Sequence, residues 1–356
     1  MFEPVRYLEW ARRLYGKVRF DLASSGVPAV ALPEWTVPPS PADDWESLRA
    51  AIAAYNDVPE SEVIAALGTT HALWLACAAL TSPGDEVLIE DPAYEPLVRI
   101  AEGAGASVTR FARTADDGFG VDPQRIARAM TPKTRLIILT NLYNPAGTRC
   151  EDDVLRAAAR VAEARGSVLL VDEVYSPFDA LVDARGVFSG SARHLAPNIV
   201  AVSSLTKCYG LGAERIGWLL GPPPVMARAH TALTASLGVL PLGHARLGRA
   251  AFASIQGLAE RARAVVSNKR ERVAGWALEH GFGWSAPREG LFGLITLPDR
   301  GDLTSIIEAG VCSHEVLVAA GAFFGVPNGF RIAWSEPADK LEEGLGRLAE
   351  VLSRHC

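Results

Sequence analysis

The chain has 356 residues, a formal net charge of −6, and a composition of 49% hydrophobic and 21% charged residues. This length can bury a large core in one or two domains, and the composition excludes a disordered chain. The acidic balance offers no basic surface for nucleic acid, and no apolar run approaches the ~20 residues of a membrane-spanning helix, so we expect neither partner. Five cysteines without metal-ligand spacing and a charged N-terminus unlike a signal peptide predict a reducing cytoplasm and no metal site.

Short apolar strands alternate with helical patterns between residues 63 and 221. The expected strands are 87–90, 136–140, 168–172, 200–203 and 216–220, and the expected helices between them are 71–80, 94–104, 123–129 and 152–164. This alternation is typical of a mostly parallel sheet with crossover helices.

After residue 241 a long helical pattern continues to about residue 280, where it can connect two domains. Beyond it, strands 292–296 and 330–333 and helices 303–309 and 338–353 indicate a smaller α+β unit. We expect the proline-rich residues 1–40 to pack on this unit or on a neighbouring subunit. The predicted domains are therefore 41–242, and 1–40 together with 243–356.

Lys207 lies among small hydroxyl and glycine residues, directly after the apolar run 199–202. Strand ends of this kind carry chemistry in open α/β folds. A partly desolvated lysine has a lowered pKa and becomes a nucleophile for aldehydes, such as that of pyridoxal phosphate (PLP). On this segment alone, a lysine that extends from a strand end into solvent is an equally good interpretation.

Two further segments suit the same cofactor. Thr69 and Thr70 precede a helix, where their hydroxyls and backbone N–H groups suit a phosphate, although the segment alone favours an ordinary N-cap. Asn144 follows a buried strand and can donate to a phenolate oxygen, although its segment also fits a simple turn.

Asp172 ends a strongly apolar strand, where an unpaired carboxylate is costly. The protonated ring nitrogen of PLP would remove that cost, and Tyr175, three residues on, can reach the phenolic oxygen of the same ring. A helix N-cap aspartate is the alternative. Arg331 lies in a short apolar strand, where its planar fork suits a substrate carboxylate or, alternatively, a buried structural ion pair.

The order of these motifs resembles that of the fold-type I PLP-dependent enzymes, specifically the class I/II aminotransferases related to aspartate aminotransferases. The resemblance covers the chain from Gly68 to Arg331. It implies a three-layer α/β PLP-dependent transferase fold, with a mostly parallel sheet in the large domain and a smaller α+β C-terminal domain. It also implies a homodimer with its sites near the subunit interface.

The resemblance also implies a role for each motif residue. Lys207 would hold PLP covalently, Asp172 would hold the pyridinium proton, and Tyr175 would bond the phenolic oxygen together with Asn144. The remaining implied contacts are the cofactor phosphate for Thr69, Thr70, Ser204 and Arg215, ring stacking for Tyr94, and the substrate for Gly26, Asn144 and Arg331.

The implied activity is ping-pong transamination between an L-amino acid and a 2-oxo acid, with Lys207 as the general base at Cα. The same motifs occur in PLP-dependent lyases, cyclases and decarboxylases. The segment 21–27 resembles the N-termini of capreomycidine-synthase-like enzymes, which cyclise or oxidise arginine derivatives. A PLP-binding regulator is less favoured because no basic helix-turn-helix precedes Gly68. A NAD-dependent enzyme is also less favoured, because no Gly-x-Gly-x-x-Gly motif follows a strand.

The sequence departs from these relatives between Gly26 and Gly68, where the chain is short. A tyrosine-glycine segment, which in relatives reaches the phosphate site of the neighbouring subunit, is missing, and whether Trp45 replaces it is open. No clear second arginine is present to select an acidic side chain. His71 and His244 fit either structural positions or substrate contacts.

Overall fold

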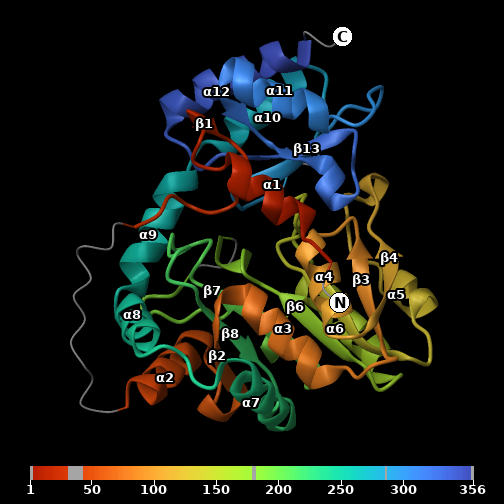
Figure 1. Ribbon diagram of the computed structural model, residues 1–356, viewed down its shortest axis with the longest axis vertical. Helices are drawn as coiled ribbons and strands as arrows, with labels where there is room; N and C mark the ends of the chain where they lie inside the picture. Colours follow the sequence, from red (N-terminus) through yellow and green to blue (C-terminus); the bar gives the residue numbers. More distant parts are fainter. Residues whose placement is uncertain (1–2, 31–42, 179–181, 285–286, 354–356) are drawn as a thin grey trace.

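The computed structural model describes residues 3–30, 43–178, 182–284 and 287–353, which form a large unit and a smaller unit stacked on it (Figure 1). Among these residues, no helix combines the length and apolar character needed to cross a lipid bilayer.

A seven-stranded sheet forms the centre of the large unit. Its spatial order is β2 (Val63–Leu67), β8 (Ile216–Leu220), β7 (Ile199–Ser204), β6 (Val168–Asp172), β5 (Thr134–Thr140), β3 (Glu86–Asp91) and β4 (Ser107–Ala112). All neighbours pair in parallel except those of β8, which is antiparallel to both β2 and β7. The predicted mostly parallel sheet is confirmed, and the structure adds β2 and β4 at its two edges.

Helices cover both faces of this sheet. One face packs against α3 (Gly68–Leu80), α4 (Glu95–Gly103) and α7 (Pro223–Leu237), and the other against α5 (Pro123–Ala129) and α6 (Asp152–Glu163). Along β5, Leu136 and Ile138 contact the first set, whereas Ile137 and Leu139 contact the second. Alternating side chains point to opposite faces of a strand, and apolar residues on both sides bury both faces. The predicted three-layer arrangement is confirmed.

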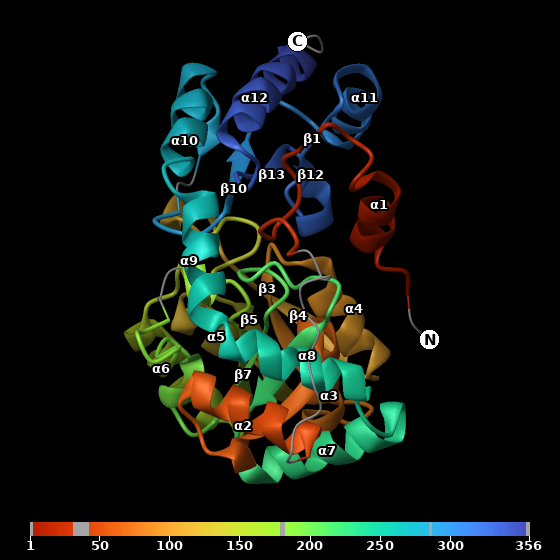
Figure 2. The ribbon, with the colours of Figure 1, turned by 90° about the vertical axis from the view of Figure 1, so that its left-hand side faces the viewer.

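Three helices connect the two units, where the sequence predicted one long helical pattern. They are α8 (Leu242–Ala253), α9 (Ile255–Val266) and α10 (Arg270–Glu279). The pattern breaks at Ser254, with φ −111° and ψ 14°, and again at Asn268, with φ 60°. The α8 helix packs on α2 (Asp44–Asn56) in the large unit, and α9 rises from it towards α10 in the small unit (Figure 2).

The small unit combines both ends of the described chain. Its antiparallel sheet has the order β12 (Ala319–Ala320), β13 (Gly329–Ala333), β10 (Phe292–Thr296) and β9 (Gly283–Trp284), and α10, α11 (Thr304–His314) and α12 (Ala338–Ser353) pack around it. From the N-terminal side, α1 (Arg6–Leu14) adds Tyr7 and Trp10 to the same core, and β1 (Phe20–Asp21) pairs in parallel with β11 (Val316–Leu317). Short 3-10 helices cover Glu60–Glu62, Ala115–Asp117, Ser176–Phe178, Ala192–His194 and Gly321–Phe324.

The part of the N-terminal segment from Tyr7 to Ala23 therefore packs on the C-terminal unit, as expected, whereas Val27 and Val30 bond the loop after β7 in the large unit. The predicted domain boundary at residue 41 lies outside the described residues, and the division at 242/243 stays a prediction.

Candidate active site

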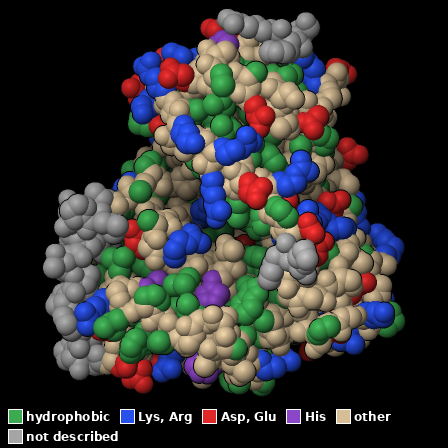
Figure 3. All heavy atoms as spheres, viewed as in Figure 1, with side chains coloured by type: hydrophobic (Ala, Val, Ile, Leu, Met, Phe, Trp, Pro, Cys, Tyr) green, Lys and Arg blue, Asp and Glu red, His purple; other side chains and the backbone are tan. Residues whose placement is uncertain are grey.

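A cavity of about 630 Å³ opens between the two units. The parallel strands β5, β6 and β7 end beside it at Thr140, Asp172 and Ser204, and ligands bind at such carboxyl ends of strands in open α/β sheets. Figure 3 shows the surface hollowed here, with Lys and Arg side chains gathered along its upper rim. The predicted site residues that line the cavity are Thr69, Thr70, Tyr94, Asn144, Asp172, Tyr175, Lys207 and Arg215.

Lys207 is partly buried in the loop after β7, and its Nζ donates to Ser25 Oγ at 3.4 Å. Burial lowers the pKa of Lys207 to about 8, and repulsion from Arg331 and Arg215 acts in the same direction. A larger fraction of the amine is therefore neutral and nucleophilic near neutral pH than in an exposed lysine.

Gly26, predicted to line the substrate site, lies against this lysine. A Cβ at Gly26 would lie 3.6 Å from the carbonyl oxygen of Lys207 and 3.7 Å from its Cδ, and the next residue, Val27, donates its N–H to the same carbonyl at 3.0 Å. The N-terminal segment is thus held against the lysine from the small-unit side.

Asp172 is buried at the end of β6 and accepts the N–H of Val174 at 3.2 Å. Burial raises the pKa of Asp172 to about 7, which outweighs the opposing effects of that N–H and of Lys207. Within the described residues, no lysine, arginine or histidine nitrogen lies within 4.0 Å of its carboxylate. A buried carboxylate in this position favours a cationic partner from outside the chain.

Tyr175 and Ser25 form a contact that the sequence analysis missed. The Tyr175 hydroxyl donates to Ser25 Oγ at 2.9 Å, and its ring packs edge-on against Phe292 at 4.8 Å between centroids. Ser25 therefore touches both Tyr175 and Lys207. Ser25 belongs to no local sequence motif, since its partner Tyr175 lies 150 residues away. In the sequence, only its position next to the predicted site residue Gly26 pointed to it.

The four predicted phosphate ligands gather at the N-terminus of α3. Thr69 Oγ1 donates to Ser204 Oγ at 2.9 Å, and the exposed Arg215 lies above Gly68. A Cβ at Gly68 would lie 2.5 Å from Arg215 Nη2 and would displace the guanidinium, and the φ of +75° at Gly68 independently favours glycine. The positive end of a helix, two hydroxyl groups and an arginine together form a site that suits a phosphate.

Arg331 is fully buried in β13 and is surrounded by neutral oxygen atoms. It donates to Asn144 Oδ1 at 2.8 Å, to the Tyr7 hydroxyl at 2.9 Å and to the Ala23 carbonyl at 3.0 Å, while its Nε has no hydrogen-bond partner. In the described part of the chain, no carboxylate comes within 4.0 Å of its guanidinium, so the alternative of a structural ion pair is wrong there. A buried guanidinium without a counter-ion is suited to a ligand carboxylate.

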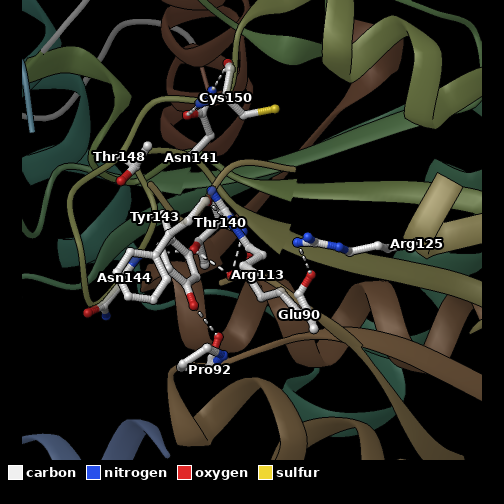
Figure 4. A network of polar contacts seen from close by, with 12 residues as sticks. Glu90, Pro92, Arg113, Arg125, Thr140, Asn141, Tyr143, Asn144, Thr148 and Cys150 are labelled. Carbon is white, nitrogen blue, oxygen red and sulfur yellow. Dashed lines mark hydrogen bonds and ion pairs between the residues drawn. The ribbon is translucent and has the colours of Figure 1, made fainter. Parts of the chain in front are cut away.

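A buried ion pair fixes the loop that carries Asn144 (Figure 4). Asn144 donates its N–H to Thr140 Oγ1 at 3.1 Å, and Thr140 Oγ1 donates to Glu90 Oε1 at 2.6 Å. Arg113 Nη1 donates to Glu90 Oε2 at 2.6 Å, and its guanidinium lies 3.7 Å from the centre of the Tyr143 ring. The sequence analysis missed this pair because Arg113 follows β4, the strand that it did not predict.

Residues 41–348 match the family described as "Aminotransferase class I and II". The chain belongs to this family. Capreomycidine synthase from Streptomyces vinaceus is 30% identical over 98% of this chain and 93% of its own. Two solved structures share the fold. A PLP-dependent aminotransferase from Streptococcus suis has a TM-score of 0.87 and 20% sequence identity, and the match covers 99% of this chain and 98% of that one. The PLP-dependent cyclase OrfR has a TM-score of 0.84 and 24% identity, with coverage of 100% of this chain and 98% of that one.

Members of this aminotransferase family depend on PLP, and the cavity fits that cofactor. The buried carboxylate of Asp172 suits the ring nitrogen, the low-pKa amine of Lys207 suits the aldehyde, and the N-terminus of α3 suits the phosphate. Tyr94 lies directly before α4 and lines the cavity, where it suits contact with the cofactor ring. Its own ring packs edge-on against the Tyr7 ring, with 5.6 Å between centroids.

Three residues whose roles were open have structural contacts. His71 Nδ1 accepts the N–H of Leu67 at 3.1 Å, and His244 Nε2 lies 3.1 Å from the Arg215 carbonyl. Of the two, His71 lines the cavity. Trp45 is exposed on α2 and donates its indole N–H to the Leu240 carbonyl at 2.8 Å, so within this subunit it contributes nothing to the site.

Proposed function

We propose that the protein is a PLP-dependent aminotransferase that moves an amino group between an L-amino acid and a 2-oxo acid. The observation that carries this proposal is the buried Arg331. Its guanidinium has no carboxylate partner among the described residues, and it donates to Asn144, which lines the same cavity as Lys207. A group that binds an α-carboxylate thus lies next to a lysine that can act on the adjacent carbon.

Each residue then has a defined task. Arg331 binds the substrate carboxylate, and Asn144, held by Thr140, orients it. When bound, PLP supplies an electron sink for the carbanion that forms at Cα. Asp172 as a carboxylate keeps the proton on the ring nitrogen, and the neutral Nζ of Lys207 removes the proton from Cα. By moving that proton away from Cα, Lys207 would supply the proton transfer that transamination requires.

A second candidate is cyclisation or elimination at the side chain of the amino acid. It is supported by the 30% identity to capreomycidine synthase over nearly the whole of both chains. The same first steps at Arg331, Asp172 and Lys207 serve this reaction. The two reactions differ after the proton has left Cα. In transamination that proton is returned, whereas in elimination or cyclisation the bond to a substituent on Cβ breaks instead.

The near-visible absorption of the PLP-loaded protein, recorded with single L-amino acids, tests both candidates. A cofactor band that bleaches with an amino acid and returns with a 2-oxo acid supports transamination. A cyclised or deaminated product in the mass spectrum, formed without any 2-oxo acid, supports the second candidate. An unchanged band with every amino acid would contradict both.

We also propose, from the family resemblance, a cytoplasmic homodimer. Light scattering coupled to gel filtration tests its mass, and a monomer at working concentration would contradict the proposal.

A further inference from the structure

Arg331, the proposed carboxylate anchor, is fully buried and is not part of the described wall of the cofactor cavity. Tyr7 of α1 lies against it, at the junction of the two units (Figures 1 and 2). The Tyr7 ring also packs edge-on against Tyr94, which does line the cavity, and the Tyr7 N–H donates to Glu95 of α4 at 2.8 Å. A ligand carboxylate therefore reaches Arg331 only if one of the buried groups around it moves.

The hydrogen bonds of Arg331 show which groups compete with a carboxylate. Nη1 donates to Asn144 Oδ1, whereas Nη2 donates to both the Tyr7 hydroxyl and the Ala23 carbonyl, so both hydrogens of Nη2 are used. A carboxylate that accepts two parallel bonds takes one of them from Nη2, because this nitrogen belongs to both the end-on and the side-on face of the guanidinium. Such a carboxylate has to replace either Tyr7 or Ala23.

The Ala23 carbonyl is held in place by its backbone. The N–H of Ala23 donates to Asp21 Oδ1 at 2.9 Å, and the preceding carbonyl, of Leu22, accepts the N–H of Ala333 at 2.8 Å. Movement of this carbonyl would disturb the contact between the N-terminal segment and β13. Ala23 is therefore the partner that Arg331 keeps.

The Tyr7 hydroxyl, in contrast, belongs to a side chain and has a second partner. It lies 2.8 Å from the Tyr15 hydroxyl, and Tyr15 donates its own proton to the Ala23 carbonyl at 3.1 Å. Tyr7 is consequently the donor in the bond between the two tyrosines, and it accepts from Arg331. When Tyr7 releases Arg331, it still has a hydrogen bond to donate.

We propose that the Tyr7 hydroxyl holds the place of the substrate's carboxylate on Arg331 and is replaced by it when the amino acid binds. The proposal rests on the proposed function, because it assumes that Arg331 binds an α-carboxylate. Before binding, Tyr7 satisfies a buried N–H that would otherwise lack a partner. On binding, a neutral hydrogen bond gives way to a charge-assisted one, which is stronger.

Calorimetric titration of the PLP-loaded protein with propionate, which is L-alanine without its amine, tests the replacement. Tyr7→Phe keeps the ring but removes the oxygen that accepts from Arg331, so one hydrogen of Nη2 stays unpaired until a carboxylate arrives. We expect propionate to bind at least about fivefold more tightly to Tyr7→Phe than to the natural chain. Equal or weaker binding to the variant would overturn the proposal, since a tyrosine that supports Arg331 or donates to the carboxylate gives that result.

Three controls locate the effect. Ethylamine, which is L-alanine without its carboxylate, should bind the natural chain and Tyr7→Phe equally. Tyr55→Phe removes a hydroxyl from another buried tyrosine pair, Tyr55 and Tyr209 at 2.6 Å, and should leave the affinity for propionate unchanged. In an Arg331→Lys background, Tyr7→Phe should no longer tighten propionate binding. A gain that persists in that background would place the competition elsewhere and overturn the proposal.

If Tyr7→Phe does not fold, hydrogen–deuterium exchange of the natural chain decides the question. The bond between Tyr7 and Arg331 joins the first turn of α1 to β13, and the proposed replacement removes it. We expect the backbone N–H groups of α1 to exchange at least about twofold faster when propionate is bound. Unchanged or slower exchange would contradict the replacement.

The two levels of the hypothesis fail in different ways. Tighter binding of propionate to Tyr7→Phe, with a cofactor band that no amino acid changes, would contradict the proposed function and keep the competition at Arg331. A cofactor band that responds to amino acids, with the same affinity for propionate in both proteins, would do the reverse.

Discussion

Each unit of the molecule buries a charged side chain, Asp172 in the large unit and Arg331 in the small unit, and the two differ in how many hydrogen bonds hold them. In the large unit, Asp172 receives one backbone N–H, at 3.2 Å, and burial raises its pKa to about 7. In the small unit, Arg331 is held by three oxygen atoms at 2.8 to 3.0 Å, from Asn144, Tyr7 and Ala23. We therefore expect the carboxylate to depend on a cation that the cofactor brings, whereas the arginine is already oriented by its three hydrogen bonds. Cofactor binding and substrate binding should respond differently to mutation.

The largest effect is expected at the residue between these two charges. Lys207→Ala should abolish turnover and covalent attachment of PLP, because no other amine lines the described part of the cavity. Intact-protein mass spectrometry after borohydride reduction checks the attachment, and circular dichroism checks that the fold is retained. Lys133→Ala, at an exposed site, is the control. Turnover at the natural rate in Lys207→Ala would remove this lysine from the mechanism.

Asp172→Asn tests the carboxylate side of the comparison with two readouts. Turnover should fall at least about 100-fold, because the ring nitrogen loses the charge that keeps it protonated. The cofactor-free variant should be more stable than the natural chain by a few kcal/mol at pH 8. A carboxyl group whose folded pKa is raised to about 7 destabilises the fold increasingly as the pH rises from its unfolded pKa towards 7. The full effect is present above 7, and none is present below the unfolded pKa.

Calorimetric melting of the two cofactor-free proteins between pH 4 and pH 8 measures this stability. The advantage of Asp172→Asn should shrink as the pH falls from 7 towards 4. A difference in melting temperature that is the same at every pH would show that the buried charge is not its cause.

Arg331→Lys tests the arginine side. We expect kcat/KM for an amino acid to fall by about 10- to 100-fold, since a lysine cannot reproduce the two parallel bonds to a carboxylate. The discrimination between an amino acid and the corresponding amine, which lacks the carboxylate, should fall by the same factor. Arg128→Lys, at an exposed position of α5, is the matched control. An unchanged discrimination would mean that the carboxylate binds elsewhere.

The smallest effect concerns the pH at which the cofactor is captured. Because burial lowers the pKa of Lys207 to about 8, the rate at which the cofactor-free protein attaches PLP should rise with pH and level off just above 8. Stopped-flow absorbance of the aldehyde measures this rate. A rise that continues to pH 10 would indicate a lysine with an ordinary pKa.

A local sequence pattern predicted the central elements of the large sheet and pointed to residues that the structure brings to the cavity, whose roles stay predictions. Asp172 and Lys207 were found because each follows a continuous apolar strand, β6 or β7, whose burial on both faces is visible in the sequence. Tyr7 and Ser25 were not found, because they reach their partners across 324 and 150 residues, and only tertiary packing creates those contacts. The edge strand β4 was missed as well. Its residues are largely half-exposed and lack the apolar run that marks a central strand.

The parallel pairing of β1 with β11 has a consequence for biosynthesis. Phe20 finds its partner Val316 about 300 residues later in the chain. At a synthesis rate of about 5–20 residues/s, roughly 15–60 s pass between synthesis of α1 and β1 and synthesis of the residues against which their apolar side chains pack. The large sheet can form during that interval, whereas the small unit closes last, and the segment that presses Gly26 against Lys207 closes with it.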